Sequence, residues 1–165
     1  MKRTDLIRFG GLAAMVGGGA WVASGTFSFW LSPLILILFV VGVMAAIAAL
    51  YALQRERYGL RFLVTWASLM AFVGVALSGW LPYTEAFLIP VGGLLLATVG
   101  LVVLAIVTIA AKVMPWWVGV ALIAGSPPFV FLWVFPWLLG VPWVVVGYAV
   151  FRAGARLSEQ PSRVQ

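Results

Sequence analysis

The stretch LLLATVGLVVLAIVTIAA, residues 94–111, decides the fold class of this chain. It contains no charged residue, and about 20 apolar residues in helical form cross a hydrocarbon layer of roughly 30 Å. Strands of a membrane β-barrel alternate lipid-facing and lumen-facing side chains, and this run shows no such alternation. The run LILILFVV at residues 34–41 has the same character. Both runs predict transmembrane helices and an all-α fold.

The composition extends this prediction to the whole chain. Of the 165 residues, 65% are apolar and only 8% are charged, whereas a soluble domain has about a quarter of its residues charged. We therefore predict a single transmembrane domain over residues 1–165, a polytopic helical bundle in contact with the lipid bilayer.

The apolar runs and the breaks between them predict six helices. Two boundaries stay open. The fourth helix begins either at Glu85, capped by Thr84, or at Pro90 as its first residue. The last turn lies either at Ser126–Pro128 or at Phe135–Trp137, where prolines interrupt the helix. The predicted helices are 6–25, 33–53, 62–81, 85–111, 115–133 and 137–151, followed by a short basic tail at 152–165.

Charge predicts the topology. As one helix, the apolar block 115–151 would be roughly 55 Å long, nearly two crossings, so it is expected to form a hairpin. With six spans, all ten Lys and Arg residues fall on one side of the membrane, and with five spans they would divide. Because basic loops face the cytoplasm, we predict three hairpins with both termini cytoplasmic. The predicted loop anchors are Arg55, Arg57 and Arg61.

Small residues recur at four-residue intervals in three of the predicted helices. Such spacing lets helix backbones approach closely, which favours helix association in lipid. These faces serve either contact with a partner or second copy, or packing inside the bundle. The residues are Gly10, Ala14 and Gly18 in the first helix, Gly42 and Ala46 in the second, and Gly93 and Ala97 in the fourth.

The residue inventory excludes several chemistries. The sequence has no Cys, no His and no Asn, and apart from Arg8 and Glu85 near helix starts, the predicted spans contain no acid, base or amide side chain. Hydroxyl groups remain, but no neighbouring base can activate them as nucleophiles. The four acids are scattered along the chain and do not form a metal site. We therefore predict a protein that is not an enzyme, without catalytic, metal-ligating or cofactor-binding residues and without a cofactor.

Glu85 is the only charged residue predicted on the outer side. In the first turn of a helix it is stabilised by the helix dipole, and Thr84 before it is a suitable cap. The alternative is that Glu85 and Thr84 contact a solute or cation at the mouth of a pathway.

Two segments resemble a known class of proteins. They are Ile7–Val22 (IRFGGLAAMVGGGAWV) and Ala111–Gly125 (AKVMPWWVGVALIAG). They resemble small six-helix integral membrane proteins of bacteria, frequent in actinobacteria, that form a domain of unknown function. The resemblance implies a six-helix fold in the bacterial inner membrane, and it assigns no site residues. The matching positions in the second segment are Val113, Pro115, Trp117, Gly119, Leu122, Ile123 and Gly125.

Three functions compete at this point. The first is a non-catalytic accessory or structural membrane component that packs against other membrane subunits or forms a homo-oligomer. The second is a channel or transporter for a small solute, working through an oligomer interface lined by Ser78 and Thr98. The third is an intramembrane enzyme, for which no activated nucleophile is visible. Nucleic acid is not an expected partner, because the basic residues lie beside apolar spans.

Overall fold

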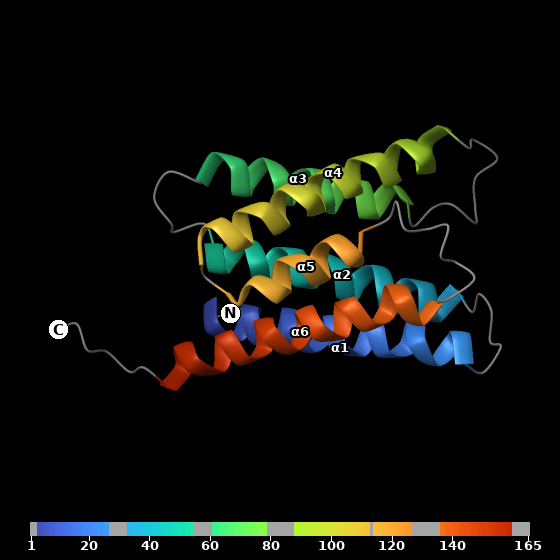
Figure 1. Ribbon diagram of the computed structural model, residues 1–165. Coiled ribbons are helices and arrows are strands. Elements are labelled where there is room, and N and C mark those ends of the chain that lie inside the picture. Colours follow the sequence, from blue (N-terminus) through green and yellow to red (C-terminus); the bar gives the residue numbers. More distant parts are fainter. Residues whose placement is uncertain are drawn as a thin grey trace.

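The computed structural model describes residues 3–26, 33–54, 61–78, 88–112, 114–126 and 136–159, which form six helices and contain no strand (Figure 1). The prediction of an all-α chain with six helices is confirmed. The helices are α1 (Arg3–Thr26), α2 (Pro33–Gln54), α3 (Arg61–Ser78), α4 (Leu88–Ala110), α5 (Trp116–Ala124) and α6 (Pro136–Glu159).

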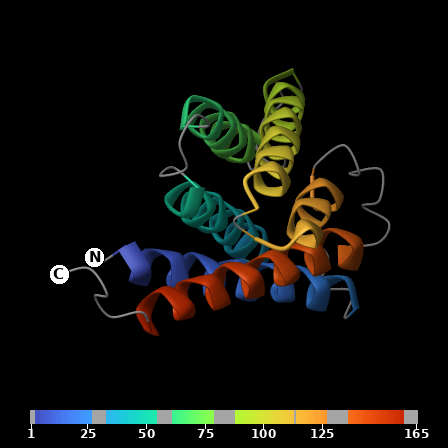
Figure 2. The same cartoon turned by 60° about the vertical axis from the view of Figure 1, so that its left-hand side comes forward.

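The helices form two closely packed groups joined by a short helix. In the first group, α1 lies against both α2 and α6, so the first and last helices of the chain are neighbours (Figures 1 and 2). In the second group, α3 lies against α4. Helix α5 contacts α4 on one side and α6 on the other, while α2 contacts α3. The start of α1 and the end of α6 therefore lie at the same end of the molecule.

Four helices are long and apolar enough to cross a membrane. They present large apolar side chains outward, including Leu34 and Phe62. An apolar exterior is what a lipid environment requires, because lipid tails do not penalise exposed hydrocarbon. The four segments are Arg3–Ser24, Pro33–Gln54, Arg61–Ser78 and Val91–Ala110.

Helix α5 is shorter than the predicted 115–133. It ends at Ala124, where the Gly125 amide donates to the Ala121 carbonyl and the Ser126 amide donates to the Ile123 carbonyl. Nine residues rise only roughly 13 Å, less than half of a hydrocarbon layer about 30 Å thick. Helix α5 therefore does not cross a membrane by itself. Both predicted positions of the last turn, Ser126–Pro128 and Phe135–Trp137, overlap residues 127–135. These residues lie outside the described residues.

Other helix boundaries also differ from the prediction, among them the end of α6 and the start of α4. Helix α6 continues to Glu159, so residues 152–159 of the predicted tail are helical. Helix α4 begins at Leu88, between the two predicted starts. At its other end, Lys112 adopts a left-handed backbone with φ of 50°, and its amide donates to the Ile109 carbonyl. This conformation turns the chain out of the helix and toward Pro115, which precedes α5.

The core consists mainly of small and medium-sized side chains. Alanines such as Ala46, Ala71 and Ala105 are completely buried, which allows neighbouring helices to lie close together. Trp143 is the largest fully buried side chain. The core therefore depends on close backbone approach more than on interlocking of large side chains.

Candidate functional site

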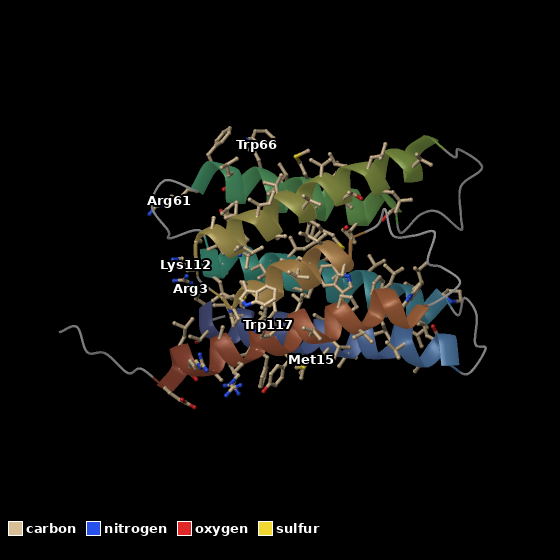
Figure 3. All side chains as sticks on the ribbon, viewed as in Figure 1. Arg3, Met15, Arg61, Trp66, Lys112 and Trp117 are labelled. Atoms are coloured by element: carbon tan, nitrogen blue, oxygen red, sulfur yellow. The ribbon has the colours of Figure 1, made fainter. Side chains whose placement is uncertain are left out.

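Titratable side chains gather toward one end of the bundle. Arg3, Arg61 and Lys112 lie together at that end (Figure 3). The others belong to the first turns of α1, the last turns of α6 and the last turn of α2, except Tyr148, which lies near the middle of α6. Within the described residues, the helix interiors therefore contain no ionised group away from this end. The full set is Arg3, Asp5, Arg8, Tyr51, Arg61, Lys112, Tyr148, Arg152, Arg156 and Glu159.

At this end, Arg3 joins the start of α1 to the end of α2. Its Nε and Nη2 atoms both donate to the Ala52 carbonyl, at 3.1 and 2.6 Å. The last carbonyls of a helix have no partner within the helix. Arg3 therefore caps α2, and its positive charge complements the negative end of the helix dipole.

A buried polar pair links α2 to α4. The Gln54 Nε2 atom donates to Thr108 Oγ1 at 2.6 Å, and the Thr108 hydroxyl donates to the Leu104 carbonyl at 2.7 Å. Gln54 is only 1% exposed, and its Oε1 atom has no hydrogen-bond partner. This pair was not predicted from the sequence, because the predicted second helix ends at Leu53 and Gln54 falls in the loop that follows. Here, α2 includes Gln54 as its last residue.

The other hydroxyls in the helices bond mainly to their own backbone. Thr98 donates to the Leu94 carbonyl and Ser78 donates to the Val75 carbonyl, at 2.8 and 2.9 Å. Such bonds satisfy a hydroxyl group inside a helix and leave it without a free donor. Ser68 is different, because its Oγ is buried and has no partner.

The small residues predicted in the first helix contact two different neighbours. A Cβ atom added at Gly10 would lie 2.5 Å from the Ala45 carbonyl oxygen of α2. One added at Gly18 would lie 2.7 Å from the Gly140 carbonyl oxygen of α6. Ala14 is buried between these glycines. Gly10, Ala14 and Gly18 therefore do not form one face for one partner.

The glycines of α1 and α6 recur every seven residues. This interval returns a helix to nearly the same face after two turns. At these repeating positions, a Cβ atom added to the glycine would lie only 2.5–2.8 Å from an atom of the facing helix. In α1, Gly10 and Gly17 face α2, and Gly11 and Gly18 face α6, which presents Gly140, Gly147 and Gly154.

The remaining small-residue positions also contact helices of the same chain. A Cβ at Gly42 would meet the Ala13 carbonyl oxygen at 2.5 Å, and one at Gly93 would meet the Ser78 amide nitrogen at 2.8 Å. Ala97 packs against Gly74 of α3. Ala46 is completely buried. In the described residues, the bundle itself occupies these faces.

Several predicted site residues cannot be placed. Thr84, Glu85, Arg55 and Arg57 lie outside the described residues. Arg61 is the first residue of α3 and is exposed. The alternatives for Glu85 therefore stay predictions.

The sequence analysis also missed the role of Trp143. Its ring is 2% exposed, and its Nε1 atom donates to the Gly125 carbonyl at 3.1 Å. This bond satisfies a carbonyl at the end of α5 and joins α5 to α6. The available signal was its position, since Trp143 falls inside a predicted span and away from the interfaces where tryptophan is common.

The described residues contain no cluster of three or more potential metal-ligating His, Cys, Asp or Glu side chains. No family model, curated protein or solved structure matches the chain. The resemblance to six-helix bacterial membrane proteins therefore stays a prediction. Inference about function rests on the residues and their contacts.

Proposed function

We propose that this chain is a non-catalytic structural or accessory component of a bacterial plasma membrane. The main observation is the distribution of polar groups. Charged side chains of the described residues lie toward one end, and the polar groups further along the helices are hydroxyl groups such as those of Tyr148 and Thr98. General acid–base and nucleophilic catalysis need an ionisable group beside the reacting atom. The sequence has no His or Cys to supply one.

The proposed topology has six membrane-embedded helices in three hairpins, with both termini cytoplasmic. Its support is the basic end of the bundle, because Lys and Arg accumulate on the cytoplasmic side of membrane proteins. A reporter that fluoresces only in the cytoplasm, fused after Gln165, is expected to fluoresce. A phosphatase that is active only outside the cytoplasm is expected to be inactive at the same position, and the opposite pattern would reverse the topology.

A partner subunit would contact large apolar side chains and not the glycine faces, because the chain's own helices occupy those faces. On α3, Phe62 is 72% exposed and Trp66 is 50% exposed, and their rings meet edge to face at 6.0 Å. Trp66 points away from the bundle (Figure 3). Exposed aromatic side chains are common in the cores of protein interfaces.

The test is the native mass of the protein extracted from its own membrane into a lipid-preserving polymer. We expect a mass above that of one chain, with other subunits or further copies present. Replacing both Phe62 and Trp66 by Ala is expected to reduce the complex. The matched control is Leu95→Ala with Ile106→Ala on the exposed side of α4. A strictly monomeric protein in lipid would disprove the proposal.

The alternative of solute passage gains no support from the described hydroxyls. Both Ser78 and Thr98 donate to carbonyls of their own helices. We therefore make no second functional proposal.

A further inference from the structure

The α1–α6 contact ends in an unusual arrangement of arginine and aromatic side chains. The Arg8 guanidinium of α1 lies over the Phe151 ring of α6, 5.5 Å from its centroid. Its stem crosses α6 at Gly154, where an added Cβ would lie 2.8 Å from Arg8 Cγ. Because Gly154 has no side chain and Phe151 provides a ring face, Arg8 is held across the neighbouring helix.

A second arginine follows this ring in the sequence of α6. Arg152 directly follows Phe151, and its Nη1 atom is 3.5 Å from the Tyr148 hydroxyl. Arg152 is exposed and Tyr148 is 50% exposed. We name the four residues Arg8, Tyr148, Phe151 and Arg152 the guanidinium seam.

The two charges of the guanidinium seam are not neutralised within the described residues. Neither Arg8 nor Arg152 forms an ion pair there with a carboxylate. The nearest acids in sequence on the two helices are Asp5 and Glu159, which are both exposed. The seam therefore presents two positive charges and a phenol hydroxyl on the surface of the bundle.

An apolar surface continues from the guanidinium seam along the bundle. Leu12 lies one turn after Arg8 in α1 and is half exposed, and Phe9 is also exposed. In a membrane-spanning helix this direction leads from the headgroup region into the hydrocarbon. A ligand with a negative head and an apolar tail would contact both surfaces, whereas a soluble anion would contact only the seam.

We propose that the guanidinium seam binds the phosphate group of an anionic phospholipid, whose acyl chain lies along Leu12. Guanidinium groups bind phosphate through paired, charge-assisted hydrogen bonds. Anionic lipids attract basic residues at the cytoplasmic surface, and tyrosine is common at that level. The inference rests on the proposed membrane topology, and it adds a defined lipid site to the general attraction between basic loops and lipid.

The test is native mass spectrometry of the purified full-length protein in detergent, titrated with phosphatidylglycerol or with phosphatidylcholine. The test variant combines Arg8→Gln with Arg152→Gln. The matched control combines Arg61→Gln with Lys112→Gln, which removes the same charge from the same end of the bundle but near α3 and α4. Circular dichroism and size-exclusion chromatography establish that each variant is folded.

We expect the affinity for phosphatidylglycerol to fall about tenfold in the test variant and less than twofold in the control, because each seam arginine contributes directly to headgroup binding. A variant combining Arg8→Lys with Arg152→Lys retains the charge but loses paired hydrogen bonding. Its affinity is expected to lie between those of the wild type and the glutamine variant, which separates phosphate recognition from charge alone.

Three outcomes would overturn the proposal. Equal losses in the test and control variants would indicate a diffuse attraction without a defined site. Equal affinity for phosphatidylcholine would show that an anionic headgroup is not required. Displacement of phosphatidylglycerol by millimolar inorganic phosphate would indicate a site for free phosphate.

These outcomes are distinct from failure of the proposed function. If the test variant loses lipid binding but the protein is strictly monomeric, the proposed accessory function is wrong and the proposed lipid site is supported. A defined complex whose lipid binding does not depend on Arg8 and Arg152 would remove only the lipid site.

Discussion

The α1–α6 contact and the α3–α4 contact both depend on glycine, but they use it differently. Between α1 and α6, glycine faces glycine: a Cβ at Gly11 would lie 2.6 Å from the Gly147 carbonyl oxygen, and one at Gly18 would meet Gly140. Between α3 and α4, Gly74 faces both Gly93 and Ala97, and Gly100 lies against Ala71. The first contact thus repeats a glycine pair along the two helices, whereas the second combines one glycine pair with contacts between glycine and alanine.

The two contacts also differ in sequence distance. Helices α3 and α4 are consecutive, whereas α1 and α6 are the first and last helices of the chain. A contact between distant segments requires closure of a long loop, which costs conformational entropy. Close backbone approach therefore occurs both between consecutive helices and where the first and last helices of the chain meet.

The largest expected effect is at the α1–α6 contact. Gly147→Leu would place its side chain against the Gly11 carbonyl and the Met15 amide, and we expect a loss of about 3 kcal/mol in the free energy of unfolding. Titration with sodium dodecyl sulfate in mixed micelles, followed by circular dichroism, measures this value. The control is Gly19→Leu, because a Cβ at Gly19 meets nothing within 4 Å. A control as unstable as Gly147→Leu would show that helix propensity, and not close approach, determines the result.

The next effect is at the α3–α4 contact. Gly100→Leu would clash with the Ala71 backbone, and we expect a loss of about 2 kcal/mol because the consecutive helices can separate slightly. The same titration measures it, with Gly92→Leu as the control in open space on α4. A loss larger than that of Gly147→Leu would contradict the distinction between the two contacts.

The hydrogen bond between Gln54 and Thr108, which joins the two helix groups, is expected to give smaller losses of stability that differ between its two residues. Thr108→Val would leave the buried Gln54 amide without its acceptor, at a cost of about 1–2 kcal/mol. Gln54→Leu removes the whole amide, including an Oε1 atom that has no partner, so we expect a loss of only about 0.6 kcal/mol. Unfolding titrations of both variants test the order, and a greater loss for Gln54→Leu would reverse this account of the pair.

An effect of similar size is expected at the end of α5. Trp143→Phe keeps most of the buried ring but removes the bond to the Gly125 carbonyl, and we expect a loss of about 1 kcal/mol. Hydrogen exchange of the amides of Gly125 and Ser126 should become faster, because the end of α5 loses its tie to α6. Unchanged exchange at both amides would show that the bond does not hold α5 in place.

Much of the architecture could be predicted from the sequence. The apolar runs predicted six helices, and the structure contains six in the described residues. The start of α2 at Pro33 was also predicted, because proline suits the first turn of a helix. The length of α5 could not be predicted, because the sequence stays apolar past Gly125 and does not reveal where the backbone hydrogen bonds of the helix end.

The candidate sites were less predictable. The spacing of small residues predicted close helix contacts at Gly10 and Gly18, but not that the two glycines contact different helices. The position of a residue on a helix fixes the direction in which it points, and which helix lies in that direction depends on the tertiary structure. Gln54 was assigned to a loop since polar residues usually lie outside spans, and its pairing with Thr108 depends on how α2 and α4 meet. The guanidinium seam likewise needs residues 143 positions apart in sequence, Arg8 and Phe151, to be neighbours.

The sequence by itself determined that the chain is helical and rich in long apolar segments, and that it has no Cys, His or Asn. Hydrophobic transfer and charge act on each residue with little dependence on distant neighbours, so composition suffices to predict helices in lipid. Only the tertiary structure decided that α1 lies between α2 and α6, that the glycine faces are occupied inside the chain, and that Arg8 meets Phe151. These features depend on contacts between segments that are far apart in the sequence, and no local pattern specifies such contacts.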